Sequence, residues 1–125
     1  MTRPLRTLLA AAAIAASAMT LSACAPSDPS IVLGSWGVPD TAGERWLTFE
    51  EGGTFNGSDG CNGMFGEYRV SGDRLELSDV GSTLMFCEGV DTWLSTAARG
   101  EIVGDELVLF NGDGTEIGTL PRSAS

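Results

Sequence analysis

The glycines set the strongest limit on what this chain can fold into. All 17 lie between Gly34 and Gly118, where they separate apolar stretches of about four to eight residues by turn signals. Stretches of that length are typical of β-strands and are too short for most helices. We therefore expect an all-β, mainly antiparallel domain, a small barrel or sandwich of about eight strands with one short helix.

Alternation of apolar and polar residues indicates where the strands lie. Met64, Tyr68 and Val70 alternate with the charged Glu67 and Arg69, so one face of this strand is expected in a core and the other in water. Turns that contain glycine join neighbouring strands into hairpins. The remaining strands are expected at residues 31–36, 46–50, 54–57, 75–77, 101–103, 106–110 and 115–120.

The spacing of the apolar residues changes between Glu88 and Gly100. Five apolar residues recur there at helical spacing: Val90, Trp93, Leu94, Ala97 and Ala98. They would share one face of an amphipathic helix, with Gly100 as its C-cap. We expect this helix to plug one end of the barrel, and a partner-binding surface is the alternative.

The first 23 residues have the pattern of a secretory signal peptide. Arg3 and Arg6 precede an uncharged, alanine-rich run from Leu8 to Met19. A membrane-spanning helix needs about 20 strongly apolar residues, and this run is shorter and less apolar.

The next feature resembles a bacterial lipobox, Leu21-Ser22-Ala23-Cys24. In such a box the cysteine takes a diacylglyceryl group and becomes the new N-terminus, and several acyl chains give stable attachment. We expect residues 24–30 to be a lipidated tether, 31–121 the folded domain and 122–125 a tail, on the extracytoplasmic side of a cell membrane. An ordinary signal peptide cut near Ala23 or Ala25 is the alternative.

Charge and composition exclude several function classes. The chain has 17 acidic residues, 7 basic residues that are all arginine, and no histidine, for a net charge of −10. Without histidine or lysine there is no Ser-His-Asp triad, no Schiff-base lysine and no Walker A phosphate loop. A surface with this excess of acidic residues repels the phosphate backbone of nucleic acid. We expect no catalysis, no cofactor, no metal, and a monomer.

Three patterns suggest sites but have simpler interpretations. Asn111, Asp113 and Thr115 imitate the start of a calcium loop, yet Glu116 stands where glycine is needed and Arg122 where the bidentate glutamate is needed, so we expect a plain hairpin turn. The chain could also form a carboxylate pair or a ligand pocket, but we expect solvated strand positions and core packing instead. The residues concerned are Glu50, Glu67 and Glu76 for the pair, and Trp36, Trp46 and Trp93 for the pocket.

Two cysteines remain besides Cys24. A secreted chain enters an oxidising compartment, so Cys61 and Cys87 are expected to form a disulfide worth about 3 to 4 kcal/mol in the chain-entropy model. Two free thiols in redox exchange are the alternative, although the chain has no CxxC spacing and no lysine or histidine to lower a thiol pKa.

Five segments in order resemble the META/HslJ-like domain, and the resemblance covers nearly all of residues 31–121. Phe86 stands where alanine is usual in the family. The segments are Gly34-Ser35-Trp36, the run from Gly53 through Gly60-Cys61-Asn62 to Gly66-Glu67-Tyr68, the Thr83-Leu84-Met85-Phe86-Cys87-Glu88 segment, and the two parts of a closing hairpin, 107–110 and 115–120.

The resemblance implies a compact β domain of bacterial envelope proteins, often lipoproteins, with links to stress tolerance and no established catalytic residues. It supports the pairing of Cys61 with Cys87 and a structural role for Asn62, whose amide would satisfy backbone groups of the glycine loop. Gly60, Tyr68, Thr83 and Met85 complete the motif. We expect a lipid-anchored protein with a binding or structural role, and a lipocalin-like carrier of a small apolar or cationic ligand is the alternative.

Overall fold

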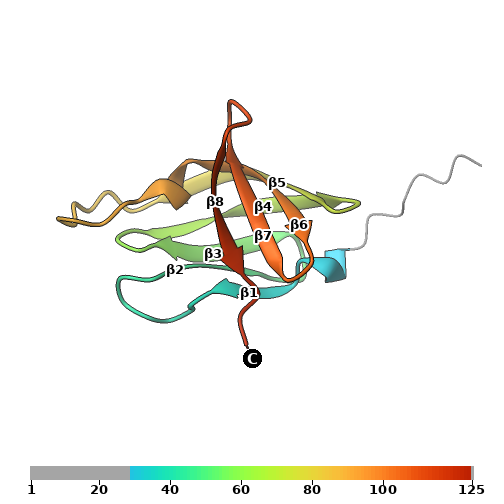
Figure 1. Ribbon diagram of the computed structural model, residues 1–125, viewed down its shortest axis with the longest axis horizontal. Coiled ribbons are helices and arrows are strands. Elements are labelled where there is room, and N and C mark those ends of the chain that lie inside the picture. Colours follow the sequence, from blue (N-terminus) through green and yellow to red (C-terminus); the bar gives the residue numbers. More distant parts are fainter. Residues whose placement is uncertain (1–28, 125) are drawn as a thin grey trace, which may run out of the picture.

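A computed structural model describes residues 29–124. The signal segment, Cys24 and most of the tether lie outside these residues. The described chain forms one eight-stranded antiparallel sheet that curls into a barrel (Figure 1). The strands are β1 (Gly34–Gly37), β2 (Arg45–Phe49), β3 (Thr54–Asp59), β4 (Gly63–Ser71), β5 (Arg74–Ser82), β6 (Ala97–Val103), β7 (Glu106–Asn111) and β8 (Glu116–Pro121).

Every strand pairs with the next strand in the sequence, and β1 and β8 approach each other at the seam. One isolated antiparallel bridge joins Trp36 to Arg122 there, and the Ser123 amide donates to the Ser35 carbonyl over 3.0 Å. The Arg122 guanidinium also lies 4.1 Å from the centre of the Trp36 ring. The expected all-β barrel of eight strands is therefore confirmed, with closure completed by a few contacts.

The barrel is less tightly paired between β5 and β6. Their register covers three residue pairs only, from Arg74 with Glu101 to Glu76 with Arg99. The rest of β5, residues 77–82, continues along β4 without β6 beside it. This divergence leaves a fork in the wall of the barrel.

Alternation along the strands fills the interior. The burial pattern of β4 follows the sequence, since Met64, Tyr68 and Val70 are buried and Glu67 and Arg69 are exposed. Burying such side chains supplies most of the stabilisation of a small domain, at about 25 cal/mol per Å² of apolar surface. The buried core comprises Val32, Trp36, Leu47, Phe49, Phe55, Met64, Tyr68, Val70, Leu75, Leu77, Leu94, Ala97, Leu107, Leu109 and Leu120.

The helix expected between Glu88 and Gly100 does not form. The chain makes only a four-residue 3-10 turn, η2 (Trp93–Thr96), and β6 already begins at Ala97. Gly89 has a positive φ of 75°, which interrupts a helix, and Gly100 lies inside β6. A Cβ at Gly100 would lie 3.0 Å from Leu107 Cδ1, so this glycine serves close packing instead of capping.

The start of the domain also differs from the expected first strand at residues 31–36. Pro29–Ile31 form a 3-10 turn, η1, and β1 begins at Gly34. Val32 between them is fully buried, and its carbonyl accepts a 2.9 Å hydrogen bond from the Trp36 indole. The apolar pattern here reflects burial of a connecting segment.

The tryptophans pack against the fold. Trp36 is fully buried, and Trp46 is half-buried on β2. Trp93 covers Gly118, where an added Cβ would lie 2.5 Å from the indole ring, and the Arg45 guanidinium stands 5.4 Å from the Trp93 ring centre. The expectation that these residues serve packing agrees with their positions.

Candidate functional site

Two motif segments meet at one end of the barrel. Cys61 follows β3, Cys87 lies in the long loop between β5 and η2, and the two form a disulfide across 26 positions of sequence. The pairing is the one expected from the sequence. It ties the loop of residues 83–92 to the β3–β4 turn.

Asn62 makes the second connection. Its Oδ1 accepts hydrogen bonds from the Met85 amide at 2.6 Å and from the Thr83 hydroxyl at 3.0 Å, and its Nδ2 donates to the Met85 carbonyl at 3.3 Å. The Gly63 amide in turn donates to the Thr83 hydroxyl at 3.2 Å. The amide of Asn62 therefore satisfies the backbone of the facing loop, and not that of the glycine loop in which it lies.

Asp59 performs the task that was expected of Asn62. One carboxylate oxygen of Asp59 accepts from the backbone amides of Cys61 and Asn62, over 2.8 and 2.5 Å. The Asp59 amide donates to the Asn62 carbonyl, which closes the turn. Asp59 is fully buried, and its other oxygen has no protein partner within residues 29–124. A carboxylate suits this turn because it accepts two donors at once.

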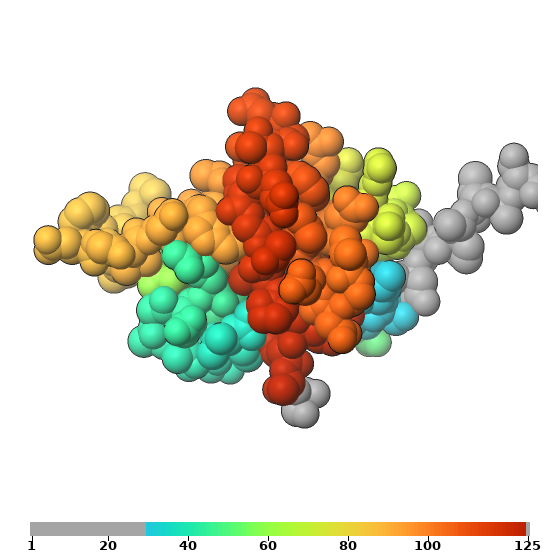
Figure 2. Space-filling model, viewed as in Figure 1, coloured from blue at the N-terminus to red at the C-terminus, as the bar shows by residue number. Residues whose placement is uncertain are grey.

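The loop held in this way carries an apolar tip, which we define as Leu84, Met85 and Phe86. Their exposed fractions are 97%, 63% and 91%. The loop projects from one end of the molecule (Figure 1) and stands apart from the barrel in the space-filling view (Figure 2). Single exposed apolar residues are ordinary, whereas three in a row on a cross-linked loop are a candidate contact surface.

Of the motif residues expected from the sequence, the structure brings six together: Gly60, Cys61, Asn62, Thr83, Met85 and Cys87. Tyr68 lies elsewhere, in the core. Its hydroxyl donates to the Glu50 carbonyl at 2.6 Å, and its ring meets Phe49 edge-on at 5.0 Å. Burial raises the pKa of Tyr68 above its usual value of 10.0, and the charge of Glu51 raises this pKa further.

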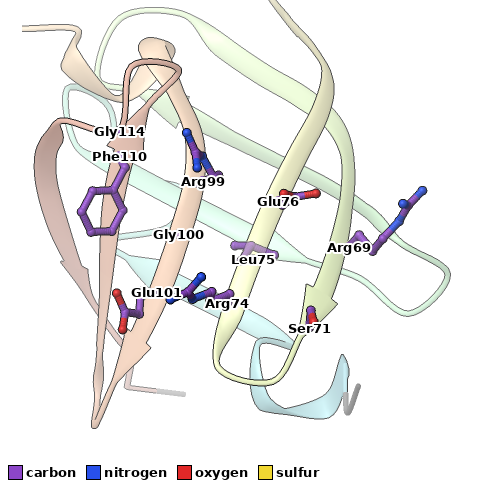
Figure 3. Close-up of a pocket in the computed structure, with 10 residues that line it drawn as sticks. All are labelled: Arg69, Ser71, Arg74, Leu75, Glu76, Arg99, Gly100, Glu101, Phe110 and Gly114. Atoms are coloured by element: carbon purple, nitrogen blue, oxygen red, sulfur yellow. The ribbon is translucent and has the colours of Figure 1, made fainter. Parts of the chain in front are cut away.

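A second feature lies on the outer face of β4 to β7, beside the fork in the barrel wall. This arginine groove, of about 400 Å³, is shown in Figure 3. It is lined by Arg69, Ser71, Arg74, Leu75, Glu76, Arg99, Gly100, Glu101, Phe110 and Gly114. A neighbouring groove of about 350 Å³ shares Arg69, Glu76 and Arg99 with it.

Strand register explains why the arginines gather there. Glu76 on β5 lies between Arg69 on β4 and Arg99 on β6, and Arg74 faces Glu101. The side chains of Arg69 and Arg74 form no hydrogen bond or ion pair with other described residues, and the Arg99 side chain donates only to the Gly112 carbonyl at 3.4 Å. These guanidinium groups are therefore available to a ligand.

The structure also places the residues of the suggested calcium loop and of the suggested carboxylate pair. Asn111 Oδ1 accepts from the amides of Asp113 and Thr115, both over 3.0 Å, within the turn between β7 and β8. This is the hairpin turn that was expected. Glu67 and Glu76 do not face each other across the β4–β5 ladder, where Glu67 lies opposite Ser78 and Glu76 opposite Arg69.

Sequence reasoning missed three parts of this arrangement. The first is Asp59, although an aspartate two residues before Cys61 is a signal for a side chain that caps backbone amides. The second is the exposure of Leu84 and Phe86, because apolar residues in a sequence are normally expected to be buried. The arginine groove depends on the register of three strands, which the sequence alone does not specify.

Comparisons with known proteins agree with this architecture. Residues 32–124 match the family model described as META domain. A solved NMR structure of a protein from Burkholderia xenovorans has a TM-score of 0.56 and 18% sequence identity, with coverage of 100% of this chain and 99% of that chain. At that identity the likeness concerns the fold alone. A search of curated proteins found no match.

Proposed function

Because the chain belongs to the META domain family, we propose that it is a lipid-anchored protein of the bacterial cell envelope that acts by binding and not by catalysis. A contribution to envelope stress tolerance is part of this proposal. The observation that carries the binding role is the apolar tip, which the disulfide and Asn62 hold in water.

The anchor rests on the sequence before the described residues. The signal-like segment and Leu21-Ser22-Ala23-Cys24 supply a thiol and small side chains where a lipoprotein signal peptidase needs them. No helix within residues 29–124 is long and apolar enough to cross a membrane. Removing the first 23 residues leaves 17 acids and 5 arginines, a net charge of −12 that gains nothing from anionic headgroups. Attachment therefore has to be covalent.

The geometry suits an anchored binding protein. The described chain begins at η1, and η1 and the loop of residues 83–92 lie at opposite ends of the long axis (Figure 1). A body tethered through its N-terminal side would present the tip away from the point of attachment. The tether from residue 25 to 30 spans at most about 20 Å at ~3.3 Å per residue, so the body stays near the lipid surface.

The interior favours this function over a lipocalin-like carrier. A carrier needs an enclosed apolar pocket, commonly of about 300 to 1,000 Å³. Here 15 buried apolar side chains fill the barrel. Three grooves among the described residues, of about 400, 350 and 300 Å³, lie at its surface, and no tryptophan lines these three. We therefore propose binding through the outer surface.

The anchor is tested by replacing Cys24 with alanine in cells that are fed labelled palmitate. We expect the wild-type chain to sediment with membranes and carry label, and Cys24→Ala to lose both. Ala25→Ser is the matched control and should behave as the wild type. A Cys24→Ala chain that still carries label would contradict the anchor.

A further inference from the structure

The apolar tip is a fixed surface that lacks a partner within the described chain. Leu84 and Phe86 are almost fully exposed, and the disulfide and the Asn62 bonds prevent the loop from folding back over them. Apolar side chains presented together on a rigid support commonly mark a binding site. The question is which chemistry complements them.

Acidic side chains outnumber basic ones in the loop that carries the tip. Between Arg74 and Arg99 the sequence contains no basic residue, and the exposed Glu88 and Asp91 lie two and five residues after Phe86. These contacts place one basic side chain at the loop, because the Arg45 guanidinium donates from two nitrogens to the Asp91 carbonyl, over 2.6 and 3.0 Å. Acidic residues around an apolar contact disfavour an anionic bilayer and favour a pocket with a cationic rim. The complementary surface is therefore apolar at its floor and rich in arginine or lysine at its edge.

The arginine groove on the same chain has this chemistry. Phe110 supplies apolar surface, Leu75 reaches the groove only from the core with 1% of its surface exposed, and Arg74 and Arg99 supply guanidinium groups from the neighbouring strands (Figure 3). Glu76 and Glu101 also line the groove, so its lining carries three positive and two negative charges. That excess is positive in a chain whose net charge is −10. A volume of about 400 Å³ accommodates one or two side chains of the tip.

We infer that the apolar tip of one copy docks into the arginine groove of a second copy. The contact is heterologous, because tip and groove are different surfaces, so a docked pair still has one free groove on one copy and one free tip on the other. Copies would therefore join head to tail into chains. This replaces the monomer expected from the sequence, and it rests on the proposed binding role, whose partner it names.

The contact is small, so the affinity in solution should be low. Three side chains bury far less than the roughly 1,200 Å² of a stable interface. Anchoring on one membrane would raise the effective concentration of the copies and so favour the contact. Detection in solution needs concentrations near the millimolar range, where NMR spectroscopy is suited to weak association.

The test mixes two variants of the full chain, purified from cells in detergent micelles. Phe86→Asp removes the tip and keeps the groove, and the double variant Arg74→Glu with Arg99→Glu removes the groove and keeps the tip. Each is expected to stay monomeric by itself at about 1 mM, while an equimolar mixture forms one dimer and nothing larger. With the tip-deficient partner isotope-labelled, amide shifts should map to β5, β6 and β7. With the groove-deficient partner labelled, they should map to residues 83–91.

Val103→Asp is the control, since Val103 is an exposed apolar residue outside both surfaces, and this variant should associate as the wild type does. Near-UV circular dichroism and thiol counting verify that each variant is folded and carries the disulfide. The inference fails if the mixture gives no shifts, if shifts fall outside tip and groove, or if Phe86→Asp associates like the wild type. Contact of the tip with lipid or with another protein alone also overturns it. Membrane attachment through Cys24 is scored separately, so loss of one result leaves the other standing.

Discussion

Asn62 holds Met85 by both ends of its amide. The Met85 amide donates to Asn62 Oδ1 over 2.6 Å, and Asn62 Nδ2 donates to the Met85 carbonyl over 3.3 Å. The side chain thus acts on the loop as a neighbouring strand would. Because Met85 is the central residue of the apolar tip, this pair links the buried motif to the exposed surface.

Replacing Asn62 should destabilise the domain. Asn62→Ala leaves the Met85 amide and carbonyl without these partners, so we expect a loss of about 2 to 3 kcal/mol in the free energy of unfolding. Urea denaturation measures it. Asn56→Ala is the control, because Asn56 is exposed on β3, and should change the value by less than about 0.5 kcal/mol. Equal stability of the two variants would contradict the role of Asn62.

Removing the disulfide should cost more than removing one hydrogen bond. We expect Cys61→Ser with Cys87→Ser to lower the free energy of unfolding by about 3 kcal/mol, because the cross-link restricts the unfolded chain. Hydrogen exchange should increase at residues 83–92 before it increases in the strands. Unchanged exchange in this loop would show that the bridge does not hold it.

The tip should contribute nothing to folding. Leu84→Ser and Phe86→Ser remove side chains that are 97% and 91% exposed, so each should change stability by less than about 0.5 kcal/mol. Leu94→Ala, at a fully buried position, should cost about 2 to 5 kcal/mol in the same denaturation assay. A cost above 1.5 kcal/mol for either tip variant would mean that the tip packs against the body.

Gly57 should tolerate no side chain. An added Cβ would lie 2.2 Å from the Trp46 carbonyl oxygen and 2.8 Å from Leu47 Cδ2, so Gly57→Ala must displace backbone and should cost about 3 kcal/mol or more. Gly112→Ala is the control, since nothing lies within 4 Å of its added Cβ. Similar melting temperatures for the two variants would contradict the close approach of β2 and β3.

Tyr68 should make the domain sensitive to alkali. Burial raises the pKa of Tyr68, so the folded chain keeps the phenolic proton at a pH where the unfolded chain loses it. The contribution is complete below pH 10 and is lost as the pH rises from there through the folded pKa. The rise in absorbance at 295 nm with pH reports the ionisation of this group alone, because Tyr68 is the only tyrosine. Tyr68→Phe should abolish this alkaline loss, and an apparent pKa of 10 or lower in the folded chain would contradict it.

Most of the strand layout follows from local sequence. Alternation at Met64–Val70 and the glycine turns act over neighbouring residues, so they indicate strands directly. The segment from Glu88 to Gly100 misled because its apolar spacing fits a helix, while the disulfide at Cys87 and the pairing of β6 with β7 determine its conformation. In this segment, tertiary contacts outweighed the helical spacing of the apolar residues.

The site was predictable in its chemistry but not in its form. The cysteines and Asn62 stand out in the sequence as motif residues. The exposure of Phe86 depends on the path of its loop, and the groove shared by Arg74 and Arg99 depends on strand register. Both arise from contacts between segments that are distant in the sequence. Such features can be identified only in the folded structure.

The central claim is that the tip is a rigid surface and not a loose loop. Backbone ¹⁵N relaxation of the full chain in detergent micelles tests it most directly. We predict order parameters near 0.85 for Leu84, Met85 and Phe86, equal to those of the strands. Values below about 0.6 at these three residues would contradict the account.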